Sequence, residues 1–200
     1  MLSNKIKFPI LLIAAALSPS LAFAHTGVGI TSGFAHGFMH PLSGLDHMLA
    51  MVMVGMFAFQ LGGRAVWLLP TTFVLLMAAG GALGITGVSM PFVEVGIALS
   101  VLVLGAVVAL NVRAPLAVAL GMVGLFAIFH GHAHGSEMPE NAGGLNYAVG
   151  FMVATMLLHA AGILAGFLSD RSSQRFGPMA VRSAGAFAVV AGVGLLTGVI

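Results

Sequence analysis

Two short stretches of the chain combine histidines with acidic residues in a pattern that suits the binding of a metal ion. They read HPLSGLDH at residues 40–47 and FHGHAHGSE at residues 129–137. Neutral imidazoles and carboxylates supply nitrogen and oxygen ligands, which suit divalent cations such as Ni²⁺, Co²⁺, Zn²⁺ and Cu²⁺. The chain has no cysteine, so a thiolate site is excluded and a soft Cu⁺ site is disfavoured. We therefore expect these two stretches to hold a divalent cation.

The spacing within the first stretch places its ligands at the start of a helix. Pro41 favours the first helical turn, so His40 is expected at the N-terminal end and Asp46 and His47 about one turn inside the outer leaflet. At about 100° per residue, His40 and His47 share a face and Asp46 can close the site from the side.

The second stretch has the periodicity of one helical stripe. His130, His134 and Glu137 stand at positions i, i+4 and i+7, whereas His132 is turned away from them. A carboxylate or a set of imidazoles inside a membrane is costly unless it has a partner or a function. The alternative to a metal site is a structural hydrogen-bond network among the same side chains.

Other polar residues are weaker candidates. His36 aligns with His40 if the helix reaches back that far, and Glu94 is either a contributor or an interfacial charge. His25 would offer an amine and an imidazole at a processed amino terminus. His159, on a stripe with methionines, either extends an inward path or bonds to a neighbouring helix. The full set of candidate metal ligands is His25, His36, His40, Asp46, His47, Glu94, His130, His134 and Glu137.

The composition indicates that membrane helices position these residues. Of 200 residues, 60% are hydrophobic and 6% are charged, and the mean hydropathy is +1.12, whereas a soluble domain has roughly 25% charged residues. We expect an all-α, polytopic membrane protein. The pI near 9.7 arises from a few arginines and does not indicate nucleic-acid binding.

The first 24 residues have the pattern of a secretory signal peptide. Lys5 and Lys7 precede a short apolar run, and Ala22-Phe23-Ala24 is typical of a cleavage site. An uncleaved signal anchor is the alternative. After cleavage the chain would begin at His25 and contain no lysine, which excludes a P-loop ATPase and a retinal Schiff base in this subunit.

The mature chain, residues 25–200, is expected to form one domain of six transmembrane helices. Hydropathy predicts spans near residues 42–61, 66–87, 92–111, 115–134, 146–168 and 181–200. Turn residues separate them, among them Gly62-Gly63, Pro91, Pro115, Gly143-Gly144 and Gly177-Pro178.

Charge predicts the orientation of these spans in a bacterial cytoplasmic membrane. If His25 lies outside, the arginines at 64, 113, 171, 175 and 182 all fall on the cytoplasmic side, and the exterior loops carry Glu94, Glu137 and Glu140. Both ends of the mature chain are then extracytoplasmic. The first span enters from outside and the fourth exits there, so both histidine stretches should meet at the same depth.

The two stretches together resemble the signatures of the HupE/UreJ family, and the resemblance extends over the mature chain. It implies a nickel permease, with cobalt as a further substrate, of the kind linked to hydrogenase or urease maturation. It also implies functional roles for the matching positions, which are His40, Asp46, His47, His130, His134 and Glu137. His132 falls in a variable position of the second signature.

The sequence therefore predicts a secondary transporter that moves nickel inward through an outer His/Asp site. Its partners would be the cation and the lipid bilayer, with no cofactor and no enzymatic activity. One alternative is an intramembrane zinc hydrolase of the ceramidase type, which Ser43, Asp46 and the histidines loosely resemble. Another is a metal sensor that binds without flux.

Overall fold

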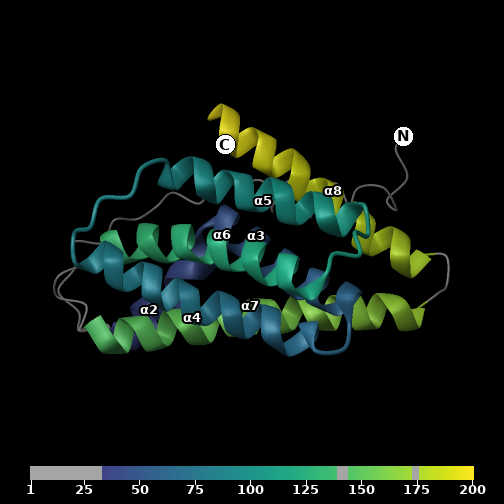
Figure 1. Ribbon diagram of the computed structural model, residues 1–200, viewed down its shortest axis with the longest axis horizontal. Coiled ribbons are helices and arrows are strands. Elements are labelled where there is room, and N and C mark those ends of the chain that lie inside the picture. The colour runs from purple at the N-terminus through teal and green to yellow at the C-terminus, as the bar shows by residue number, and fades with distance from the viewer. Residues whose placement is uncertain (1–32, 139–143, 173–175) are drawn as a thin grey trace, which may run out of the picture. The chain divides into compact units, whose positions relative to one another are not determined.

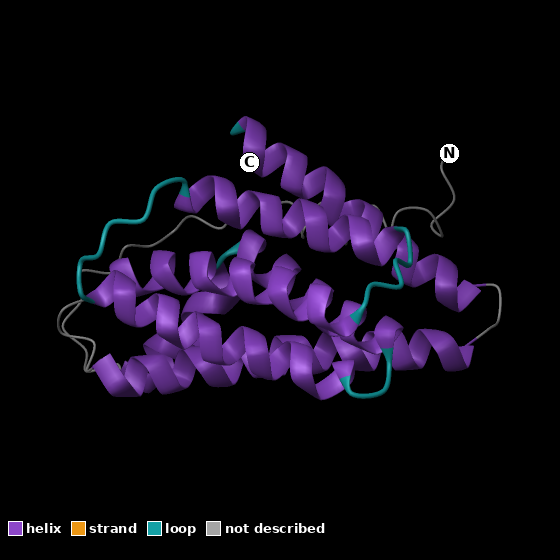
Figure 2. Cartoon of the chain, in the orientation of Figure 1, coloured by secondary structure: helices purple, strands orange, loops and turns teal. Residues whose placement is uncertain are grey.

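The computed structural model describes residues 33–138, 144–172 and 176–200, which form seven α-helices and no strand (Figures 1 and 2). The helices are α2 (Gly33–Ser43), α3 (Leu45–Leu61), α4 (Ala65–Ile85), α5 (Val93–Ala109), α6 (Leu116–Ser136), α7 (Gly144–Ser172) and α8 (Phe176–Thr197). The predicted all-α class is confirmed. The predicted signal peptide, residues 1–24, and His25 lie outside the described residues.

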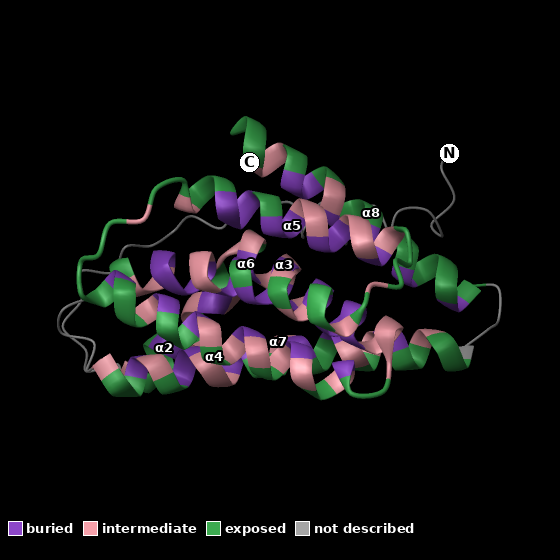
Figure 3. Cartoon of the chain, in the orientation of Figure 1, coloured by how far each residue is buried: buried purple, intermediate pink, exposed green. Residues whose placement is uncertain are grey.

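The helices have the length and apolar character of membrane spans. Within the described residues, α4, α6, α7 and α8 are each long and apolar enough to cross a bilayer, and α2 and α3 qualify only as a pair bent by 83°. Helix α5 is apolar but shorter, with 17 residues. Large apolar side chains such as Trp67 and Val190 are exposed on the helix surfaces, which suits contact with lipid (Figure 3). The chain is a multi-pass membrane protein.

The first predicted span is not one straight helix that begins near Pro41. Pro41 lies inside α2, which extends back to Gly33, and the break falls at Gly44, whose backbone is extended. Glycine loses more conformational entropy in a helix than any other residue, so a break at this position costs little. His40 therefore lies in the last turn of α2 and His47 in the first turn of α3, and the prediction that they share one helical face is wrong.

A second difference lies at Gly177-Pro178. The sequence predicts a turn there, but both residues lie in the first turn of α8. Proline is tolerated at this position because the first backbone N–H groups of a helix have no partner within the helix. The last helix consequently starts about five residues earlier than the hydropathy prediction.

Glycines allow α4 and α6 to pack closely, which places the histidines of α6. A Cβ at Gly80 or Gly84 of α4 would collide with the backbone of α6, at the carbonyls of Ile128 and His132 respectively. Conversely, a Cβ at Gly131 would collide with the carbonyl of Met77. Small residues at such contacts let helix backbones approach in membranes. The Gly80-x-x-x-Gly84 pattern therefore serves packing within the bundle.

The arginines and the histidine stretches lie at opposite ends of the helices. The Arg113 guanidinium donates a hydrogen bond to the carbonyl of Gln60 at the end of α3, and Arg182 Nε donates to the carbonyl of Ala109 at 2.9 Å. Arg64 precedes α4 on the same side of the bundle. His47 lies at the other end of α3, and the second histidine stretch forms the C-terminal end of α6.

We expect Gly80→Ala to destabilise the protein and Gly81→Ala to serve as its matched control. A Cβ at Gly80 has no room against α6, whereas one at Gly81 would lie 3.5 Å from the carbonyl oxygen of Gly131, an ordinary contact. Gly80→Ala should lower the free energy of unfolding by about 1–3 kcal/mol, measured by unfolding in detergent with circular dichroism. Equal stability of the two variants would contradict the close packing of α4 on α6.

Candidate metal site

The two histidine stretches meet inside the bundle, as the sequence predicts. His47 of α3 and His130 and His134 of α6 each bring one possible ligand atom within 4.8 Å of the other two. The ring centroid of His47 lies 5.3 Å from that of His130 and 4.9 Å from that of His134. His47 and His130 are fully buried, and His134 is partly buried. We call these three residues the inner group.

A second group of possible ligands lies toward the end of the bundle and shares His134 with the inner group. It consists of His40, His134 and Glu137, again with one atom of each within 4.8 Å. His40 Nε2 lies 3.0 Å from His134 Nδ1 and 3.5 Å from Glu137 Oε2. The Glu137 side chain is 57% exposed, so this outer group reaches from the surface to the buried imidazoles.

The histidines hold the Glu137 carboxyl in its charged form. Hydrogen bonding to His134 is the main cause that lowers the pKa of Glu137 below its ordinary value, and the charges that His134 and His40 can carry act in the same direction. Partial burial opposes them. The outer group therefore presents a carboxylate to an approaching cation.

Hydrogen bonds join the two groups into one line. His47 Nε2 lies 3.2 Å from Thr155 Oγ1 and His47 Nδ1 lies 3.2 Å from His134 Nε2, so one proton is shared in each of these contacts. His134 Nδ1 lies 3.0 Å from His40 Nε2 and 3.6 Å from Glu137 Oε2. Binding a cation between His47 and His134 would displace the shared proton.

A serine orients the third imidazole of the inner group. Buried Ser100 of α5 donates its hydroxyl proton to the carbonyl of Ile97 at 2.6 Å, and its oxygen lies 2.7 Å from His130 Nε2. Since a hydroxyl has one proton, His130 Nε2 must be the donor in that contact. His130 Nδ1 then carries a free lone pair, and it has no hydrogen-bond partner within the described residues. An oriented, unpartnered imidazole nitrogen is what a metal ligand requires.

The remaining sequence candidates lie outside the two groups. The Asp46 carboxylate accepts a hydrogen bond from the backbone N–H of His47 at 2.7 Å, within the first turn of α3. Glu94 is exposed in the first turn of α5, and His36 contacts the Tyr147 ring with centroids 5.8 Å apart. His132 is turned away, as predicted, and its Nε2 lies 2.6 Å from the carbonyl oxygen of Val88.

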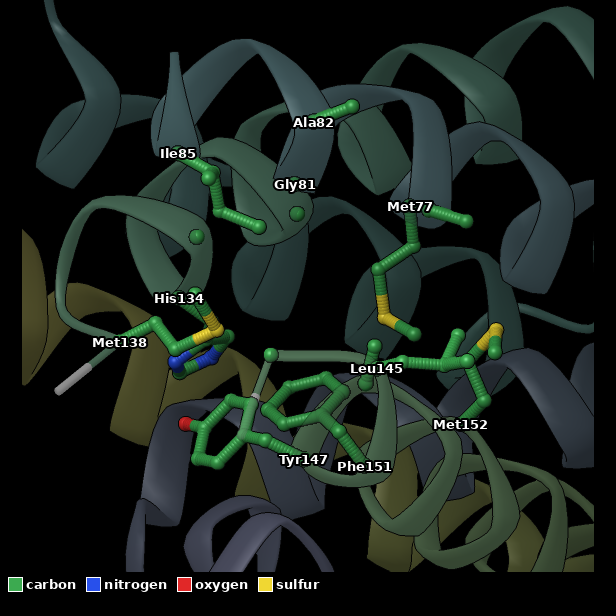
Figure 4. Close-up of a pocket in the computed structure, with 15 residues that line it drawn as sticks. Met77, Gly81, Ala82, Ile85, His134, Met138, Leu145, Tyr147, Phe151 and Met152 are labelled. Atoms are coloured by element: carbon green, nitrogen blue, oxygen red, sulfur yellow. The ribbon is translucent and has the colours of Figure 1, made fainter. Parts of the chain in front are cut away.

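Aromatic side chains of α7 cover the shared histidine. In Figure 4 the rings of Tyr147 and Phe151 lie beside the imidazole of His134, and the Phe151 centroid is 4.9 Å from that of His134. These three residues line a mostly apolar cavity of about 360 Å³, and Met152 lines it as well. Sequence reasoning missed Ser100, Tyr147, Phe151 and Thr155, because a single serine, threonine or aromatic residue in an apolar span has no distinguishing spacing.

We expect Ser100→Ala to weaken the binding of a divalent cation without unfolding the protein. Loss of the contact that orients a ligating histidine typically costs about 10- to 100-fold in metal affinity. Isothermal titration with Ni²⁺ in detergent measures the change, and Thr197→Ala is the control because its hydroxyl donates to carbonyls of its own helix, α8. An unchanged affinity in Ser100→Ala would show that His130 does not bind the ion through the oriented ring.

Comparison with known proteins identifies the family. A family model described as HupE / UreJ protein matches residues 13–195. Protein HupE of Rhizobium leguminosarum bv. viciae is 47% identical over 186 residues, which cover 93% of this chain and 95% of the relative. No solved structure matches the chain. The two histidine stretches, the all-helical membrane fold and these matches show that the chain belongs to the HupE/UreJ family.

Proposed function

We propose that the protein is a secondary transporter that moves Ni²⁺, and also Co²⁺, into the cell across the cytoplasmic membrane. The observation that carries this proposal is the pair of ligand groups that share His134, one partly exposed and one buried. Two linked sites of increasing depth suit a cation that is captured at the surface and then moved inward. A protein that only retained the cation would need a single group of ligands.

The proposed topology has six spans after a cleaved signal peptide, residues 1–24. Helices α2 and α3 together form the first, bent span, and α5 forms a short third span. The histidine end would face outward and the arginine end the cytoplasm, in agreement with the enrichment of Arg in cytoplasmic loops. Both ends of the mature chain would then be extracytoplasmic.

The proposed path begins at Glu137 and passes through His134. The carboxylate of Glu137 and the imidazole of His40 attract the hydrated ion. His134 lies 3.6 Å from Glu137 and 3.2 Å from His47, so it can bind the ion first with the outer group and then with the inner group. Entry into the inner group replaces water by imidazole nitrogens and releases a proton. The membrane potential would drive inward movement with roughly 4.6 kcal/mol per 100 mV for a doubly charged ion.

The ligand chemistry supports a borderline divalent cation, and the family supports nickel. Imidazole ligands without thiolates suit Ni²⁺, Co²⁺ and Zn²⁺, and the resemblance to the HupE/UreJ family implies nickel among them. We also propose that the imported nickel serves hydrogenase or urease maturation. Asp46 would contribute its negative charge beside His47 rather than a direct bond to the ion.

The zinc-hydrolase alternative fits the geometry less well. Such an enzyme needs a carboxylate that handles the zinc-bound water. The Asp46 carboxylate is instead engaged by the backbone of its own helix, and the hydroxyl of Ser43 donates to the carbonyl of His40 at 2.6 Å on the exposed end of α2. Asp46 belongs to neither group of possible metal ligands.

The decisive experiment measures uptake of radioactive nickel by the purified protein in liposomes with an inside-negative potential. His134→Ala should lower the initial rate at least about tenfold, because both groups lose their common member. His132→Gln is the matched control, since it removes another histidine of α6 but keeps a donor for the Val88 carbonyl. It should retain the rate of the wild type.

Three further variants complete this experiment. His130→Ala should reduce uptake as strongly as His134→Ala, and Asp46→Asn should reduce it less than Asp46→Ala because the amide oxygen still accepts from the His47 N–H. Wild-type protein that binds nickel but carries no flux would overturn the transport proposal. Metal-dependent cleavage of a lipid amide without flux would favour the hydrolase.

A further inference from the structure

His159 is a fully buried histidine that neither ligand group uses. It lies in the middle of α7, its exposed fraction is 1%, and neither Nδ1 nor Nε2 has a hydrogen-bond partner within the described residues. Of the two alternatives that the sequence leaves open for His159, the structure therefore does not support a hydrogen bond to a neighbouring helix. A neutral imidazole has one donor and one acceptor, and leaving both unpaired in an apolar interior lowers the stability of the fold. Such a side chain requires a partner that the protein itself does not supply.

The position of His159 continues the line of polar groups that starts at the inner group. Thr155, which bonds His47 Nε2, precedes His159 by four residues on α7, so the two lie on the same face about 6 Å apart along the helix. The Phe73 ring lies between both sites, with its centroid 5.8 Å from that of His130 and 5.3 Å from that of His159. His159 is thus the next nitrogen ligand on the way toward the arginine end.

The surroundings of His159 offer space and an oxygen ligand. A pocket of about 290 Å³ between α4 and α7 is lined by His159, Val66, Pro70 and Thr71, among others. Pro70 lies inside α4 and has no N–H, so the carbonyl of Val66, four residues earlier, receives no helical hydrogen bond from it. Backbone carbonyls freed in this way coordinate cations in other membrane transporters.

We propose that His159 is a transient ligand for the transported divalent cation after it leaves the inner group. The ion arrives with part of its hydration shell, binds an imidazole nitrogen of His159 and proceeds toward the arginine end. The inference rests on the proposed transport function, which it extends to a second site.

The absence of cysteine from the chain gives this proposal a spectroscopic test. In His159→Cys the only thiol is at the proposed site, so Co²⁺ bound there would produce a thiolate-to-cobalt charge-transfer band in the near ultraviolet, which the wild type cannot show. Leu157→Cys is the matched control, because its side chain is exposed on the same helix. We expect the band in His159→Cys and none in Leu157→Cys.

The flux assay tests whether the site is on the path. His159→Phe should lower the maximal rate of nickel uptake in liposomes at least about tenfold and leave the half-saturating concentration within about twofold, since capture at the outer group is intact. His159→Cys should restore part of the rate, because a thiolate can replace imidazole as a ligand. Titration with Ni²⁺ checks that each variant keeps the inner group and hence its fold.

The outcomes separate this inference from the proposed function. No cobalt band in His159→Cys, or uptake by His159→Phe at the rate of the wild type, would overturn the role of His159 while wild-type flux upholds nickel transport. If the wild type itself shows no flux, the transport proposal fails, and the transit role of His159 fails with it.

Discussion

The contact between imidazoles inside the bundle is the interaction on which the rest of the site depends. Buried polar rings need partners, and His134 finds two of them in other histidines, since it bonds His40 on one side and His47 on the other. The close approach of α4 and α6 at their glycines places His134 for both contacts. A cation that enters this line exchanges hydrogen bonds between rings for coordination bonds, so the groups that bind it are already assembled.

Much of the site could be predicted from the sequence. Helical periodicity decides which side chains share a face, and the number of membrane crossings decides which ends of the helices lie on the same side. The i, i+4, i+7 spacing places His130, His134 and Glu137 together and turns His132 away, and the even number of crossings between the two stretches, four, brings them to one end. The partners across helices could not be predicted. Ser100 and Thr155 depend on the rotation of α5 and α7, which apolar spans without amphipathic periodicity do not encode.

The bend at Gly44 shows where local rules mislead. Pro41 at a helix start is a sound expectation, yet α2 continues through it and Gly44 breaks the chain instead. The bend nevertheless keeps His40 and His47 on either side of His134, so the predicted grouping is right for a different geometric reason. It also sets Asp46 against the backbone of His47, which explains why this acid, a candidate ligand from its sequence position, lies outside both groups.

The central claim is that imidazoles of the inner group bind the transported ion, and X-ray absorption spectroscopy of the nickel-loaded protein tests it most directly. The account predicts a nickel environment with three imidazole ligands, seen as the multiple-scattering pattern of the rings, and its weakening in His130→Ala. A spectrum with only oxygen ligands, unchanged in His130→Ala, would contradict the account.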